Sequence, residues 1–148
     1  SADDVMQKTR EEQIAEIRQK TGIDEALIRE LVFEFYRRIR GDAVLAPVFE
    51  ERISDWDTHL ERMCAFWSSV ALMSGQYSGQ PMQKHQPLPV SGAHFDRWLS
   101  LFETTAEELC SPPAAAHFIE RARRIAESLA LGIAAHKGVM LKRGERLQ

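Results

Sequence analysis

The sequence predicts an all-α domain, and three observations support that class. Apolar residues recur at helical spacing in four segments, and no strand-type alternation of any length is present. The connections between these segments are short or marked by proline and glycine. The 148 residues suit one domain, and 44% hydrophobic with 28% charged residues is ordinary for a globular protein.

The N-terminal segment, residues 1–21, is charged and has little apolar periodicity, which predicts a weak helix or a loose extension. Thr21 and Asp24 have the spacing of a capping box, so we expect a helix from about Ile23. Gly41 suits the left-handed position just past its end. The apolar positions of this helix predict one broad buried face, formed by Ile28, Leu31, Val32, Phe35, Tyr36 and Ile39.

A short apolar turn centred on Pro47 and Phe49 is expected next. Ser54 and Asp57 give a second capping signature, and a strong helix is predicted over residues 55–73. Its apolar stripe consists of Trp56, Leu60, Met63, Trp67 and Val70, with His59 and Phe66 one step round the same face.

Two further helices are predicted in the C-terminal half. Ser91 is expected to cap the third helix, and Ser111 followed by Pro112 starts the fourth, over residues 113–137. The tail, residues 138–148, has no helical pattern and is expected to fray. The apolar positions are Phe95, Trp98, Leu99 and Phe102 in the third helix, and Phe118, Ala122, Ile125, Leu129 and Ile133 in the fourth.

The stretch QPMQKHQPLPV, residues 80–90, connects the second helix to the third and carries His85 at its centre. Pro81, Pro87 and Pro89 restrict the backbone and each removes an amide donor. Taken alone, His85 is most simply a loop histidine in water. A histidine on such a stiff segment cannot easily turn away, however, so it is also a candidate ligand.

Composition and motifs exclude several functional classes. A formal charge of −3 and a pI of about 6.0 give no electrostatic footprint for nucleic acid. No apolar run is long enough for a membrane span, and the acidic N-terminus is unlike a signal peptide, so we expect a cytoplasmic protein. Cys64 and Cys110 are expected to be packed, reduced thiols. Phosphate-loop, GxSxG, HExxH and CxxC motifs are absent from the sequence.

Three isolated polar groups remain on apolar helical faces: His59, Tyr36 and Trp98. Each alone is more often an ordinary core residue, because buried imidazole, phenol and indole groups usually find hydrogen-bond partners. Together with a rigidly placed His85, they suggest a flat apolar cavity with one ligating side and one hydrogen-bonding side. Haem fills such a cavity, with a proximal histidine on the iron and polar groups opposite. A helical bundle without haem is the plainer alternative.

Residues 22–137 resemble the third group of truncated haemoglobins. The resemblance rests on the order and spacing of FEFYRRIRGD, APVF, WDTHLERMCAFW, YSGQPMQKH and HFDRWLSLF. It implies a shortened globin in which two pairs of antiparallel helices enclose haem b. Residues 1–21 and 138–148 lie outside it, as an N-terminal extension and a C-terminal tail.

The resemblance also implies roles for individual residues. His85 becomes the proximal ligand of the haem iron, and Tyr36, His59 and Trp98 become the distal residues that face the bound gas. The remaining residues of the implied haem pocket are Phe49, Met63, Phe66, Trp67, Phe95 and Phe102. No role is assigned to His94, His117 or His136, which are expected to be exposed or structural.

The expected function is therefore oxygen binding or transport, by a cytoplasmic haem protein that binds dioxygen and other diatomic gases. Distal N–H and O–H donors stabilise bound dioxygen because it carries partial negative charge. One alternative is a nitric-oxide dioxygenase or peroxidase-like enzyme, which would need a separate reductase because no flavin or nicotinamide domain is recognisable here. Another is a haem-based gas sensor or partner-binding module, although 148 residues leave no room for an output domain. Whether the protein is an enzyme stays open at this point.

Overall fold

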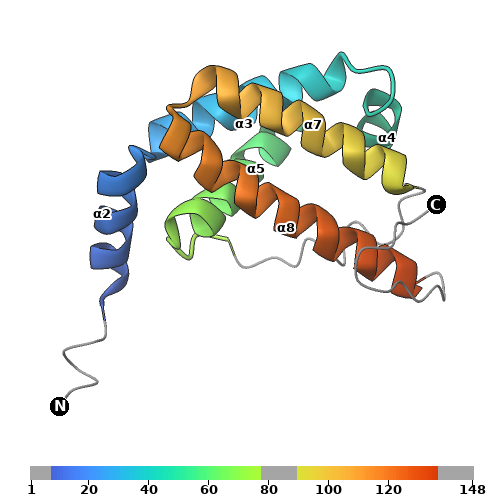
Figure 1. Ribbon diagram of the computed structural model, residues 1–148. Coiled ribbons are helices and arrows are strands. Elements are labelled where there is room, and N and C mark those ends of the chain that lie inside the picture. Colours follow the sequence, from blue (N-terminus) through green and yellow to red (C-terminus); the bar gives the residue numbers. More distant parts are fainter. Residues whose placement is uncertain (1–7, 78–89, 137–148) are drawn as a thin grey trace.

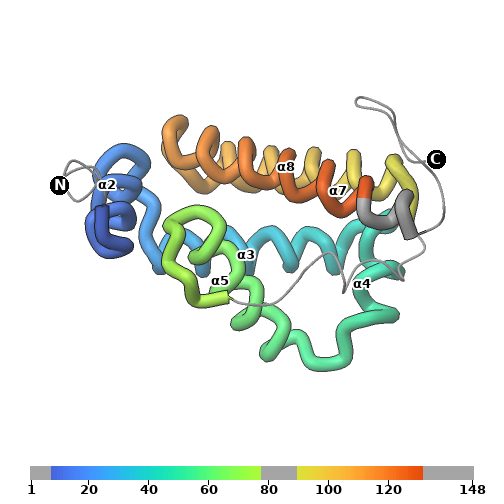
Figure 2. Tube along the Cα trace, turned by 90° about the horizontal axis from the view of Figure 1, so that it is seen from below, coloured from blue at the N-terminus to red at the C-terminus, as the bar shows by residue number. Residues whose placement is uncertain are grey.

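Six α-helices in two layers form the part of the protein that the computed structural model describes, residues 8–77 and 90–136 (Figure 1). They are α2 (Arg10–Thr21), α3 (Glu25–Arg40), α4 (Ala46–Arg52), α5 (Trp56–Leu72), α7 (Gly92–Leu109) and α8 (Pro112–His136). In Figure 2, α3 and α5 form one layer, and α7 and α8 pack together in the other. No strand occurs in the described residues. The all-α prediction is confirmed, and two layers of two long helices make the expected 2-over-2 sandwich.

Asp24 caps α3, because its carboxylate accepts a hydrogen bond from the Leu27 amide (2.8 Å). The helix therefore begins at Glu25 rather than near Ile23. The expected capping box is wrong, since Thr21 is the last residue of α2. The buried face is the predicted one and consists of Ile28, Leu31, Val32, Phe35, Tyr36 and Ile39.

The charged N-terminal segment contains a well-formed helix, α2. Thr9 caps its start, and Gly22 ends it in the left-handed conformation with φ of 75°. The helix buries no residue completely, but Ile14 and Ile17 pack against the core. Contacts with α5 and α8 therefore stabilise a helix whose own apolar pattern is weak.

A buried carboxylate, and not a left-handed glycine, holds the turn after α3. The expected conformation of Gly41 is wrong, since its φ is −97°. Asp42 accepts hydrogen bonds from the amides of Val44 (3.1 Å) and Leu45 (3.0 Å). Its other oxygen accepts one from Nε of Arg97 in α7 (2.7 Å). The Arg97 guanidinium lowers the pKa of Asp42, so the carboxylate is charged at neutral pH and links this turn to α7.

The expected apolar turn at Pro47 and Phe49 is the short helix α4, with proline in its first turn. Asp55 caps α5, one residue after the predicted Ser54, and accepts a hydrogen bond from the Thr58 amide (3.1 Å). Both differences are small, and the pattern of apolar positions is unaffected by them.

The starts of the last two helices agree with the sequence. Ser91 caps α7 in a reciprocal arrangement in which its amide donates to Nδ1 of His94 (3.1 Å). Pro112 is the first residue of α8, which ends at His136, close to the predicted range of 113–137. The predicted tail, residues 138–148, lies outside the described residues.

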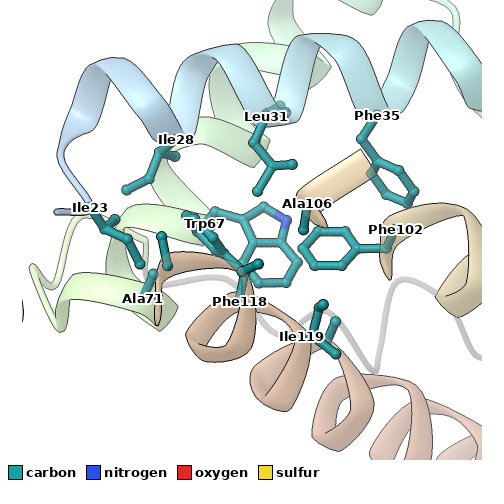
Figure 3. Close-up of a cluster of buried hydrophobic side chains, with 14 of the residues drawn as sticks. Ile23, Ile28, Leu31, Phe35, Trp67, Ala71, Phe102, Ala106, Phe118 and Ile119 are labelled. Atoms are coloured by element: carbon teal, nitrogen blue, oxygen red, sulfur yellow. The ribbon is translucent and has the colours of Figure 1, made fainter. Parts of the chain in front are cut away.

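Stacked aromatic rings join the two layers at the centre of the core (Figure 3). Trp67 of α5 stacks on Phe102 of α7, with ring centroids 4.9 Å apart and planes 17° apart. Phe35 of α3 meets Phe102 edge-on at 5.1 Å, and Phe118 of α8 meets Trp67 at 6.1 Å. Each of the four long helices therefore contributes a ring to one cluster.

Both cysteines are free thiols and are partly buried, as predicted. Burial raises the pKa of Cys110 to about 11 and also raises that of Cys64, so neither thiol is ionised at neutral pH. None of the described helices is long and apolar enough to cross a membrane.

We predict that Phe102→Ala lowers the free energy of unfolding by about 3–5 kcal/mol, because the cavity it leaves cannot close between two layers. Phe33→Ala is the control, since Phe33 is a phenylalanine of α3 that is 39% exposed, and we expect a change of less than ~1 kcal/mol. Urea unfolding at matched cofactor content measures both values. Equal losses in the two variants would contradict the central place given to Phe102.

Two side chains of α8 cap the C-terminal end of α5. Nε2 of His117 lies 2.8 Å from the carbonyl oxygen of Ala71, and Nε of Arg121 donates to that of Val70 (3.2 Å). The last carbonyls of a helix have no partner within the helix, so these bonds satisfy two of them. Burial is the main cause that lowers the pKa of His117, so the bond is made by the neutral ring at neutral pH.

The lowered pKa of His117 makes stability depend on pH in a defined direction. Unfolded histidine takes up a proton near pH 6.5, whereas the folded ring does so only at lower pH. The unfolded state therefore binds more protons below about pH 6.5, and the free energy of unfolding should fall as the pH falls through that window. His117→Gln keeps an amide donor that does not titrate and should reduce this slope. Urea titrations of both proteins between about pH 5 and 8 measure how the free energy of unfolding depends on pH. The same pH dependence in wild type and His117→Gln would refute the role given to His117.

Candidate functional site

An apolar cavity of about 400 Å³ lies between the two layers, bounded by α3, α4, α5, α7 and α8. Its volume falls in the range of small-molecule and cofactor sites, roughly 300–1,000 Å³. Most of its wall is apolar, with polar groups at a few positions. The lining residues are Tyr36, Leu45, Val48, Phe49, Arg52, Ile53, His59, Arg62, Met63, Phe66, Trp67, Tyr77, Val90, His94, Phe95, Trp98, Ile125 and Leu129.

The cavity brings together most of the residues that the sequence predicted for the site. Eight of the ten line it, namely Tyr36, Phe49, His59, Met63, Phe66, Trp67, Phe95 and Trp98. Phe102 lies behind the wall, where its ring stacks on those of Trp67 and Trp98. His85 lies outside the described residues, so its expected role as iron ligand stays a prediction.

Tyr36 and His59 form a polar corner of the cavity. Tyr36 belongs to the buried face of α3, and His59 lies in the first turns of α5. Their rings meet edge-on, with centroids 5.1 Å apart and planes 83° apart. Burial raises the pKa of Tyr36 well above its usual value, so its hydroxyl keeps its proton and acts as a donor.

Trp98 adds a second donor from the opposite layer. Its indole ring is held between Phe35 of α3 (5.6 Å, edge-on) and Phe102 of its own helix (5.8 Å, stacked). Among the described residues, neither the Trp98 indole nor the Tyr36 hydroxyl has a hydrogen-bond partner. Polar groups facing a cavity without a protein partner are suited to a polar ligand inside it.

His94 lines the cavity and was missed as a site residue, although its expected structural role is correct. Its Nδ1 accepts the hydrogen bond from the Ser91 amide at the start of α7. In the neutral ring, the proton is therefore on Nε2, which makes that atom a donor. To bind iron through Nε2, the neutral ring would need its proton on Nδ1 instead. Nδ1 could then no longer accept the hydrogen bond from the Ser91 amide, and the cap of α7 would be lost. The sequence signal was the spacing of Ser91 and His94, which matches a capping box with histidine in the place of glutamate.

Two arginines place positive charge on the cavity wall. Arg52 ends α4, and Arg62 lies three residues after His59 on α5. No ion pair is recorded for Arg62 within the described parts of the chain. Guanidinium groups bind carboxylates well, so this wall suits an anionic ligand. Neither arginine could be predicted as a site residue from the sequence, because arginines on helices usually face solvent.

The chemistry of the wall fits haem. The described residues contain no group of three or more His, Cys, Asp and Glu that would hold a metal ion. In haem, the porphyrin supplies most of the ligands of the iron, and one protein histidine is enough. The apolar wall suits the faces of a porphyrin, and the arginines suit its carboxylates.

Comparisons with known proteins agree on one family. Residues 16–130 match the family model described as bacterial-like globin. The chain is 32% identical over 109 residues to a group 3 truncated haemoglobin of Campylobacter jejuni, and the match covers 70% of this chain and 86% of that protein. A group 1 truncated haemoglobin of Nostoc commune is 36% identical over 70 residues, or 47% of this chain and 58% of that protein.

The fold comparison points the same way. The crystal structure of a group III truncated haemoglobin from Campylobacter jejuni superposes with a TM-score of 0.69 at 29% sequence identity. The match covers 83% of this chain and 95% of that one. The likeness therefore extends over both helix layers and not only over the segments that line the cavity.

Proposed function

Because this chain belongs to the bacterial-like globin family, we propose that it holds haem b in the central cavity and reversibly binds dioxygen there. Globins bind haem and, through it, diatomic gases. The observation that carries the finer proposal is a pair of donors, the Tyr36 hydroxyl and the Trp98 indole, which belong to residues that line the cavity and have no hydrogen-bond partner among the described residues. A cytoplasmic location and a separate reductase are part of the same proposal.

His85 is the proposed proximal ligand. When bound, haem supplies a flat apolar surface and an iron atom with an open position for a gas. Three histidines have described rings, and two of them are engaged elsewhere: His94 caps α7, and His117 bonds to the Ala71 carbonyl. His59 lies in the polar corner beside Tyr36. His85, in the segment that also carries Pro81, Pro87 and Pro89, is the ligand that the sequence motif favours.

Tyr36, His59 and Trp98 are proposed to orient and stabilise the gas. Tyr36 donates from a hydroxyl whose pKa is raised by burial, so the proton stays in place across the physiological pH range. A hydrogen bond to a charged acceptor contributes about 1.5–3 kcal/mol. Each such bond therefore slows the release of dioxygen by roughly tenfold or more.

Arg52, Arg62 and His94 are proposed to hold the carboxylates of the haem. Arg62 supplies a guanidinium on the cavity wall, and Nε2 of His94 supplies a donor while Nδ1 maintains the cap of α7. Charge-assisted bonds of this kind fix the rotation of a flat cofactor about its own axis. The apolar wall alone would leave that orientation open.

We predict that the purified protein shows haem absorption spectra in its ferric, ferrous and CO-bound ferrous forms, and that His85→Gly loses haem or retains it weakly. Imidazole added to His85→Gly should restore binding, because it replaces the missing ring. His117→Gln serves as the control, because His117 bonds to the Ala71 carbonyl and does not line the cavity, and the iron spectrum should be unchanged. A wild-type ferrous spectrum from His85→Gly without imidazole would show that another residue binds the iron.

We predict that Tyr36→Phe speeds the release of dioxygen by about tenfold or more, since one bond to a charged acceptor is lost while the ring remains. Carbon monoxide carries little charge when bound and should leave at nearly the wild-type rate. Stopped-flow displacement of each gas measures both rates. Tyr77→Phe removes the other tyrosine hydroxyl on this cavity and should change neither. Equal acceleration of both gases in Tyr36→Phe would mean that Tyr36 acts through cavity shape.

A further inference from the structure

A surface cleft between α3 and α5 reaches the tyrosine that also lines the central cavity. Among the described residues, Tyr36 alone lines both the central cavity and this cleft. Trp56, the first residue of α5, lines the cleft beside it, together with Arg40 and Leu60. The partition between solvent and the polar corner of the cavity is therefore only one layer of side chains thick at this place.

Trp56 is the main part of this partition. Its ring contacts Tyr36 (centroids 6.2 Å apart) and His59 (5.7 Å), both of which line the cavity. On the other side, the Arg40 guanidinium lies 4.4 Å from the centre of the indole. Arg40 in turn donates to the carboxylate of Glu50 (3.2 Å). The Arg40 guanidinium thus covers one face of the indole at the surface. The rings beside the indole, those of Tyr36 and His59, form the polar corner of the cavity.

The indole N–H of Trp56 shows which property of this residue matters. Nε1 is buried and has no hydrogen-bond partner among the described residues. Burying a donor without an acceptor is unfavourable, so a position that only needed an apolar ring would favour phenylalanine. The indole is larger than a phenyl ring and fills the partition more completely. We infer that the size of the Trp56 side chain is what matters at this position.

We propose that a diatomic gas passes between solvent and the cavity through this cleft, and that Trp56 is the side chain that limits its passage. The inference rests on the proposed function, since it needs a gas that binds in the cavity. Passage requires the indole to swing outward, away from Tyr36 and from under Arg40. Trp56 lies at the start of α5, where a helix opens locally most easily, so this motion does not disturb the core.

A side chain that only limits passage has a distinctive kinetic effect. Lowering a barrier speeds movement in both directions by the same factor and leaves the equilibrium affinity unchanged. A residue that acts by positioning Tyr36 or His59 would instead change the release of dioxygen and leave the association of carbon monoxide unaltered. The two roles are therefore separable with two gases.

Flash photolysis of the CO complex tests the proposal with Trp56→Phe and Trp56→Ala in the haem-loaded protein. We expect CO association and dissociation to rise together, modestly in Trp56→Phe and by about tenfold in Trp56→Ala, with unchanged affinity. Phe33→Ala is the matched control, since Phe33 lines the same cleft without a recorded ring contact to Tyr36 or Trp56, and its rates should equal those of wild type.

Unchanged CO rates in Trp56→Ala would overturn the proposal, as would faster dioxygen release without faster CO association. If Trp56→Ala does not hold haem, Arg40→Ala takes its place: uncovering the indole should raise both CO rates by one smaller factor, and unchanged rates again overturn the route. If the wild type binds no haem, the proposed function fails instead, which separates the two failures.

A second measurement does not depend on gas kinetics. Xenon is apolar and of similar size to a diatomic gas, and the CO-bound ferrous protein is diamagnetic. Under xenon pressure, we expect the nuclear magnetic resonance signal of the Trp56 indole N–H to shift in a saturable way. An indole signal that does not respond to xenon would show that the cleft does not admit a gas-sized atom, and the route would be rejected.

Discussion

The stacked pair of Trp67 and Phe102 is the contact on which the rest of the structure depends. It joins α5 in one layer to α7 in the other, and Phe35 and Phe118 close it from the remaining two long helices. Trp67 is also part of the cavity wall, and Trp98 stacks on the far side of the same cluster. The aromatic core and the wall of the cofactor site are thus one continuous packed unit, so the shape of the cavity is as rigid as the core itself.

This arrangement separates two kinds of polar group. The donors proposed to face the gas, from Tyr36 and Trp98, are on the buried faces of long helices, where packing limits their movement. The charged groups proposed to face the cofactor, from Arg52 and Arg62, sit on the outer part of the wall and carry flexible side chains. Rigid donors suit a small ligand whose position must be fixed closely, whereas long side chains adapt to a large cofactor as it settles.

Much of the fold could be predicted from the sequence because helical periodicity alone decides which face is buried. The six buried residues of α3 and the cap at Ser91 follow from such local patterns. The hydrogen bond between Asp42 and Arg97 could not be foreseen, since the two residues are 55 positions apart and meet only in the folded chain. Asp55 caps α5, whereas Ser54 was predicted. The sequence could not decide between them because adjacent capping residues look equivalent there. His94 was missed because its cap is local, whereas its place on the cavity wall depends on how the two layers pack.

The same link between Asp42 and Arg97 has a consequence for synthesis on the ribosome. The carboxylate can accept the amides of its own turn as soon as that turn leaves the ribosome, but Arg97 follows 55 residues later. Until then, α4 and its Phe49 have no tie to α7, and the donor of Trp98 has not yet been made. At about 5–20 residues per second, this leaves an interval of several seconds in which the nascent chain cannot enclose a cofactor. Loading therefore belongs to a late stage of translation or to the released protein.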